Sequence, residues 1–172
     1  MSVPSSAGTP DASEAPFGID ELFFSRTDPG GIIQAGNAVF RRVSGYEWDE
    51  LLAKPHKIIR HPDMPRAVFR LLWDTIREGR PIGAYVQNRA KDGRHYWVFA
   101  VVTPVAGGYL SVRLKPGSEL LGVVKQEYAA LGSAERAGAL GGRWRSSRLR
   151  EEAVGMALAA CHAYRRDVHY LV

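Results

Sequence analysis

The chain has 172 residues, of which 45% are hydrophobic and 24% are charged, and its formal net charge is +5. This composition is typical of a soluble globular protein, and the length leaves room for one domain of ordinary size with tails. A single cysteine, Cys161, excludes an internal disulfide and a cysteine-based metal cage, and no apolar run approaches the ~20 residues that a membrane span needs.

Residues 1–20 are predicted to be a disordered N-terminal tail. The first 16 are rich in Ser, Ala, Pro and Gly and show no hydrophobic periodicity. They have neither the basic region nor the apolar region of a secretory signal, so we expect a cytoplasmic protein.

Residues 21–117 contain the elements of one domain, which begins with a β-hairpin. The Asp-Pro-Gly-Gly of residues 28–31 separates two short apolar runs, and it predicts a turn because proline presets φ and glycine adopts positive φ. Asn37 is the expected cap of a short helix that Gly45 ends, and a second short helix is predicted over residues 48–52.

The longest helix of this half is predicted to begin near two prolines. Pro62 and Pro65 are tolerated only in the first turn of a helix, where Asp63 also suits the helix dipole. Apolar residues then recur at helical spacing over residues 68–76, and Gly79 closes the helix.

Three strands follow and complete the predicted sheet. They are expected at residues 82–88, 94–105 and 109–114, with glycine-containing turns between them. The second of these strands is apolar on both faces, so we expect it inside the sheet. The order of two strands, three helices and three strands predicts an α+β fold, a five-stranded antiparallel sheet with helices packed on one face.

Residues 118–172 are predicted to form a helical extension that transmits a signal or makes a dimer contact. Helical patterns cover residues 118–131 and about 148–168, and the glycines of residues 138–142 separate them. Basic residues of the chain are scattered rather than gathered on one face, so we do not expect nucleic-acid binding.

Several motifs within residues 22–116 occur together in a known family. Residues 31–37 (Gly-Ile-Ile-Gln-Ala-Gly-Asn), followed by Phe40 and Ser-Gly-Tyr46, resemble the opening half of PAS domains. A second series is narrower and resembles the PAS domain of the bacterial aerotaxis receptor and its relatives. It consists of Arg60-His61-Pro-Asp63-Met-Pro, Trp73, Asn88-Arg-Ala-Lys-Asp-Gly and His95-Tyr96-Trp97.

This resemblance implies the PAS fold and a sensor rather than an enzyme. Domains of this type hold FAD non-covalently and report redox or oxygen state to a chemoreceptor-type signalling partner, and we expect a homodimer formed through the flanking helices. The resemblance implies cofactor-binding roles for residues of the same type here, and Tyr96 and Trp97 would add aromatic surface. The implied positions are Arg60, His61, Asp63, Trp73 and Asn88.

Two alternatives to a flavin sensor stay open. In a cofactor-free dimerisation or docking module, the aromatic residues would only fill the core, and Arg60 would pair with Asp63 at the surface. In a heme sensor, His56, His61 or His95 would ligate the iron. The sequence has no nucleophile elbow, phosphate-binding loop or zinc-protease motif, so we expect no catalytic residues.

Overall fold

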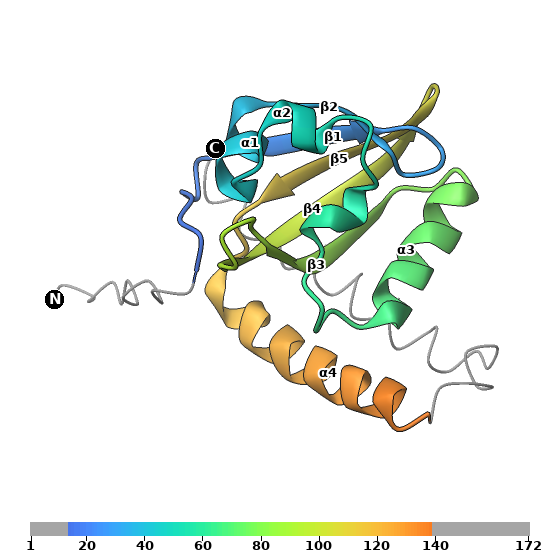
Figure 1. Ribbon diagram of the computed structural model, residues 1–172. Helices are drawn as coiled ribbons and strands as arrows, with labels where there is room; N and C mark the ends of the chain where they lie inside the picture. Colours follow the sequence, from blue (N-terminus) through green and yellow to red (C-terminus); the bar gives the residue numbers. More distant parts are fainter. Residues whose placement is uncertain (1–13, 139–172) are drawn as a thin grey trace, which may run out of the picture.

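A five-stranded antiparallel sheet organises the part of the chain that the structure describes, residues 14–138 (Figure 1). The computed structural model places the strands in the order β2-β1-β5-β4-β3. They are β1 (Phe23–Thr27), β2 (Ile33–Gly36), β3 (Ile82–Arg89), β4 (His95–Val105) and β5 (Gly108–Leu114). Strands from the two ends of the domain therefore meet where β1 pairs with β5, and the predicted α+β fold is confirmed.

Short helices join the two halves of the sheet and cover one face of it (Figure 1). They are α1 (Ala38–Ser44), α2 (Trp48–Leu51), the 3₁₀ helix η1 (His56–Ile59) and α3 (Arg66–Arg77). The predicted cap of α1 is confirmed, since the Asn37 side chain accepts the Phe40 N–H at 3.1 Å and Gly45 ends the helix at φ 72°. The sequence did not predict η1.

The predicted start of α3 is wrong. The helix begins at Arg66 with Pro65 as its N-cap, so Pro62 and Asp63 lie before it. The reason is the edge of the sheet: Arg60 forms a β-bridge with Asn88, and the His61 N–H donates to the Gln87 carbonyl at 3.3 Å. A helical backbone could not make these extended contacts. Residues 60–64 instead form a strap, which we call the edge strap, along the free side of β3.

Alternation along β4 gives the sheet two distinct faces. Ala100 and Val102 point towards α3, and we call this the inner face. Trp97 points to the outer face, where its ring packs against Tyr128 with 6.1 Å between ring centroids.

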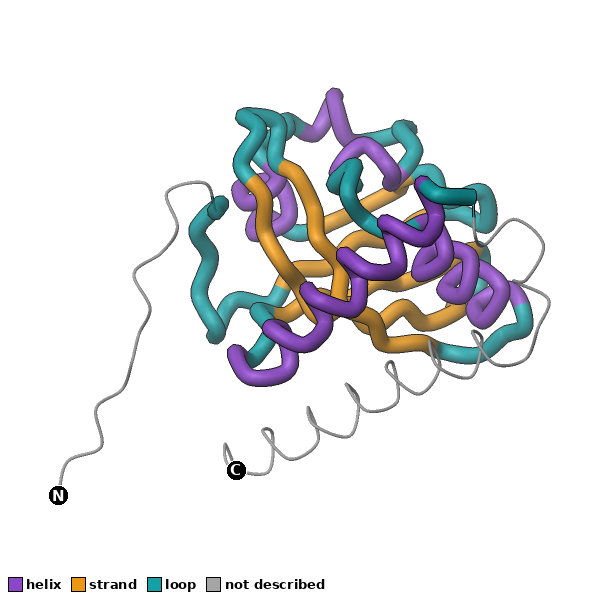
Figure 2. Tube along the Cα trace, turned by 90° about the horizontal axis from the view of Figure 1, so that it is seen from below, coloured by secondary structure: helices purple, strands orange, loops and turns teal. Residues whose placement is uncertain are grey.

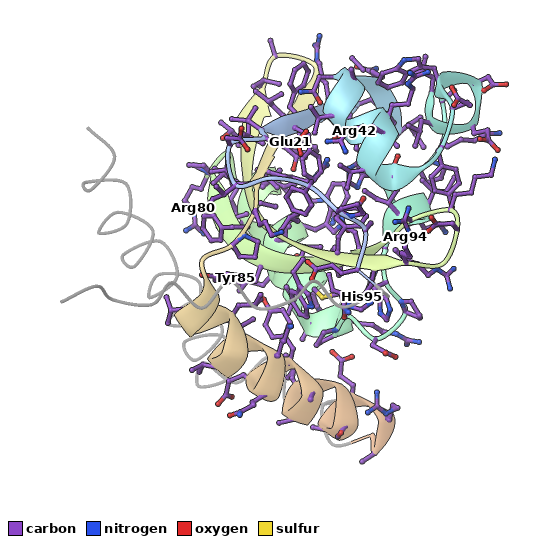
Figure 3. All side chains as sticks on the ribbon, turned by 90° about the vertical axis from the view of Figure 1, so that its left-hand side faces the viewer. Glu21, Arg42, Arg80, Tyr85, Arg94 and His95 are labelled. Atoms are coloured by element: carbon purple, nitrogen blue, oxygen red, sulfur yellow. The ribbon has the colours of Figure 1, made fainter. Side chains whose placement is uncertain are left out.

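Helix α4 (Ser118–Arg136) crosses the outer face, as the view from below shows (Figure 2). The Tyr128 hydroxyl donates to the backbone oxygen of Tyr85 at 3.1 Å, and Tyr85 lies just above the helix in Figure 3. The Glu135 carboxylate accepts the backbone N–H groups of Arg66 and Ala67 at 2.9 and 2.7 Å. The sequence predicted that this helix ends at residue 131, whereas in the structure it extends to Arg136, and Glu135 in its last turn contacts α3.

The prediction of an entirely disordered tail is wrong for residues 14–17. The Ala15 N–H donates to the His95 carbonyl at 2.8 Å, and the Phe17 ring packs edge-on against Phe23 at 5.5 Å. Glu21 pairs with Arg42 of α1 (Figure 3). Two isolated apolar residues give no periodic signal, so only the completed fold shows where they are buried.

The second helix predicted in the extension, residues 148–168, lies outside the described residues. Within residues 14–138, none of the helices is both long enough and apolar enough to cross a membrane.

Candidate functional site

A cavity of about 270 Å³ lies between α3, η1 and the inner face of the sheet. Its volume is just below the range of about 300–1,000 Å³ that is common for small-molecule sites. Helix α3 supplies one apolar wall and the sheet supplies the other. These walls consist of Phe69, Leu72, Trp73, Ile76, Val86, Ala100 and Val102.

Trp73 is held in the cavity wall by the β1–β2 turn. Its ring meets Tyr109 edge-on at 5.6 Å. Gly31 also lies close to the ring, at φ +81°, and a Cβ placed there would be 2.9 Å from the Trp73 ring. Glycine at this turn therefore serves both the positive φ and the close approach of the indole.

One polar corner of the cavity contains Asn88 and Arg60. Asn88 is 3% exposed, and its Nδ2 has no hydrogen-bond partner among the described residues. The Arg60 guanidinium lies 3.8 Å from the centre of the Phe69 ring and donates to the Met64 carbonyl at 3.3 Å. Burial lowers the pKa of Arg60, and the charge of Glu135 opposes that shift. This corner thus joins the cavity to the edge strap and to α4.

A second polar corner of the cavity contains Arg113 and His56, and both contact Ser25. Arg113 is 1% exposed, and its Nη2 donates to the Ser25 Oγ at 2.5 Å and to the His56 Nε2. Because a guanidinium can only donate, His56 must accept at Nε2 and carry its proton on Nδ1. The pKa of His56 is held well below its usual value, mainly because the ring is buried and to a smaller extent because the positive charge of Arg113 is close. The imidazole is therefore neutral near pH 7.

Of the seven predicted site residues, three line the cavity: Arg60, Trp73 and Asn88. His61 and Asp63 lie in the edge strap, where the Asp63 N–H donates to the His61 Nδ1 at 3.2 Å. The Asp63 carboxylate also lies 3.8 Å from that nitrogen, so its neighbour is His61 rather than Arg60.

The last two predicted site residues do not line the cavity. Tyr96 is buried on the inner face beside Phe17 and Phe23, and its hydroxyl has no partner among the described residues. Trp97 belongs to the outer face against α4. Tyr96 is a core residue, and Trp97 is separated from the cavity by the sheet.

Sequence reasoning missed Arg113. It followed the apolar positions of β5, which are Leu110, Val112 and Leu114, and ignored the opposite register. The sequence carried no signal for it, because it did not predict that residues 109–114 would form the middle strand of the sheet.

The structure does not favour the heme alternative. Among its three histidine candidates, only His56 lines the cavity, and its Nε2 already accepts from Arg113. Within residues 14–138, no group of three or more His, Cys, Asp or Glu side chains could hold a metal ion.

Comparisons with known proteins agree with this geometry. Residues 35–110 match the family model described as the PAS fold. The aerotaxis receptor of Escherichia coli (strain K12) is 40% identical over 121 residues, which are 67% of this chain and 24% of the receptor. The biofilm dispersion protein BdlA of Pseudomonas aeruginosa is 30% identical over 104 residues, which are 59% of this chain and 25% of that protein. The chain thus spans about a quarter of the length of these two curated relatives.

A solved structure supports the fold alone. The light state of the blue-light photoreceptor Aureochrome1 LOV superposes with a TM-score of 0.50 at 23% sequence identity. The match covers 66% of this chain and 90% of that one, so the resemblance in fold extends over nearly all of that domain.

Proposed function

This chain carries a PAS domain that resembles that of the bacterial aerotaxis receptor, and on that premise we propose that it is a redox or oxygen sensor holding FAD between α3 and the sheet. The observation that carries the proposal is the cavity itself. Its walls are apolar, and two buried donors beside it, Asn88 Nδ2 and Arg113 Nη1, have no partner among the described residues. An orphaned buried donor costs free energy, so a ligand that satisfies it is favoured.

The residues present fit a flavin. A flat apolar ring system suits the slot between Trp73 and the sheet, and its carbonyl oxygens and ring nitrogens are acceptors for buried donors. We assign Asn88 and Arg60 to orienting the ligand, and Trp73 to excluding water from one face. The dinucleotide is larger than the cavity, so we expect part of it to lie outside, towards the exposed Lys57.

A bound flavin would supply the redox chemistry, since its charge and hydrogen bonding change on reduction. The chain's own residues would relay that change. Asn88 is joined to Arg60 by a β-bridge, and the negative charge of Glu135 on α4 raises the pKa of Arg60 against the larger effect of burial. A shift at Asn88 would therefore reach α4 through the edge strap, where we place His61 and Asp63 as positioning residues.

Helix α4 is the element through which the signal is proposed to leave the domain. We propose that α4 and the segment after it pass the signal to a chemoreceptor-type partner, and that the flanking helices form a homodimer in the cytoplasm. The proposal assigns no catalytic residue to the chain.

The test is the flavin content of the purified full chain. We expect a yellow protein that releases FAD on heating. Asn88→Leu removes a buried donor and should lower the FAD content at least about threefold, the equivalent of ~0.7 kcal/mol. Trp97→Phe changes an aromatic residue on the outer face and is the matched control, with its FAD content unchanged.

Circular dichroism must show that both variants are folded. A folded but colourless parent chain would reject the flavin proposal and favour the cofactor-free docking module. A Soret band would favour heme instead.

A further inference from the structure

The interior of this domain contains a cation with no anion to balance it. Arg113 projects from the middle strand, and no acidic side chain pairs with it among the described residues. The Phe23 and Phe40 rings lie 5.5 and 5.1 Å from its Cζ, and their faces offer only partial compensation. Burial lowers the pKa of Arg113 to about 10, so the guanidinium is still charged at neutral pH.

The neighbours of Arg113 orient the charge without neutralising it. Ser25 is fully buried and accepts from Nη2, while the neutral His56 accepts from the same nitrogen. The Ser25 Oγ also lies 3.0 Å from the His56 Nε2. Both acceptors are uncharged, and Nη1 is left without a partner. Removing a charge from water without a counter-charge costs free energy, so an apolar residue at this position would make the domain more stable. The presence of a charged residue here therefore points to a functional role.

The remaining charges around the cavity have the same sign. Its lining includes Lys57 and Arg60 besides Arg113, and it includes no aspartate or glutamate. Lys57 is exposed, Arg60 is half-buried and Arg113 is buried, so positive charge continues from the rim to the interior. A cleft lined by one sign of charge concentrates ligands of the opposite sign.

We propose that Arg113 is the anion-binding and potential-setting residue of the cavity, where it pairs with the acceptor-rich edge of a planar heteroaromatic ligand and favours the more negative form of that ligand. Ser25 and His56 are its positioning residues. This inference rests on the proposed flavin site and adds how that site is tuned.

The redox consequence has a definite sign. Two electrons and one proton from a soluble reductant convert an oxidised flavin into a form with one negative charge, in which N5 has gained a hydrogen. A cation in the dry interior interacts with that charge with little screening by salt. Arg113 should therefore raise the reduction potential of the bound flavin.

The test compares the full chain with neutral replacements of Arg113. In Arg113→Gln, we expect the ratio of reduced to oxidised FAD at a fixed potential to fall at least tenfold. For a two-electron couple this is a drop of about 30 mV in midpoint potential, measured by dithionite titration against a reference dye. Arg113→Lys keeps the positive charge but loses the planar guanidinium group. The potential of this variant should therefore lie closer to that of the parent chain than the potential of Arg113→Gln does.

Two further variants make the result decisive. Arg80→Gln removes the same charge from an exposed position that is not part of the cavity lining, and its potential should not change. Arg113→Met serves if the glutamine variant does not fold, because an apolar chain suits the buried site. Its ligand-free form should melt no lower than the ligand-free parent.

The outcomes separate the two proposals. A parent chain that cannot be loaded with FAD rejects the proposed function and this inference with it. A loaded parent whose Arg113→Gln and Arg113→Met variants keep the parent potential rejects this inference alone.

Discussion

His56 shows how a single neutral ring makes the stability of this domain depend on pH. Its pKa is held well below the usual value in the folded chain, whereas an unfolded histidine has a pKa of about 6.5. The unfolded chain therefore binds a proton below about pH 6.5 that the folded chain does not, and stability is lost as the pH falls.

We expect the free energy of unfolding to decrease by up to about 1.4 kcal/mol per pH unit from this residue below about pH 6.5. His56→Gln keeps an acceptor for Arg113 but cannot be protonated, so urea unfolding at pH 7.5 and 5.0 should differ less than in the parent. His61→Gln is the control variant. Burial lowers the pKa of His61 as well, but its ring is partly exposed and the Asp63 charge opposes the shift. This variant should therefore reduce the difference in stability between pH 7.5 and 5.0 by less than His56→Gln does. An unchanged pH dependence in His56→Gln would contradict the neutral ring.

Gly31 and Gly79 separate backbone strain from steric contact. Both have positive φ, at +81° and +79°, but a Cβ at Gly31 would meet the Trp73 ring while a Cβ at Gly79 would have no atom within 4 Å. Gly79→Ala should cost about 1–2 kcal/mol through the backbone alone. Gly31→Ala should cost more, shift the tryptophan fluorescence and reduce FAD binding, because it displaces the cavity wall. Equal losses of stability with normal FAD binding would show that the indole moves aside freely.

At the level of elements, the sequence correctly predicted the features that depend only on residues close to one another in the chain. The hairpin at residues 28–31, the Asn37 cap and the three late strands follow from turn chemistry and alternation, which act over a few residues. The edge strap and the burial of Phe17 depend on strands far away in the sequence, so no local pattern indicated them. Arg60, Trp73 and Asn88 came from family resemblance, and the charge of Arg113 became meaningful only once β5 lay in the middle of the sheet.

Helix α3 depends on α4 for its N-terminal cap. Pro65 offers no side-chain cap and the first turn of α3 has no acidic residue, whereas both Glu135 oxygens accept backbone N–H groups there. Glu135→Ala should therefore lower the free energy of unfolding by about 0.5–2 kcal/mol, measured with urea. Glu127→Ala, at an exposed position of the same helix, is the matched control and should have little effect. Similar values for the two variants would mean that α4 is not held by this cap.

On the scale of the whole molecule, the cavity and α4 are connected by few intermediates. Asn88 is joined to Arg60 by a β-bridge, and the pKa of Arg60, which burial lowers, is raised by the negative charge of Glu135, the residue that caps α3. If the state of a ligand changes the docking of α4, then the state of α4 must change the ligand equilibrium by the same free energy. The proposed sensor can therefore be tested through changes in α4 as well as through changes in the cavity.

Glu135→Gln tests that reciprocity in the full chain loaded with FAD. The variant keeps an acceptor for the α3 backbone but removes the negative charge that acts on Arg60, so the cavity becomes more positive. A more positive cavity favours the reduced, anionic ligand, and we expect the midpoint potential to rise, opposite in sign to the fall expected for Arg113→Gln. Glu127→Gln removes the same charge from an exposed site on α4 and should leave the potential unchanged. Equal potentials in Glu135→Gln and Glu127→Gln would show that α4 does not sense the cavity through Arg60, and the signal would then have to leave through the sheet.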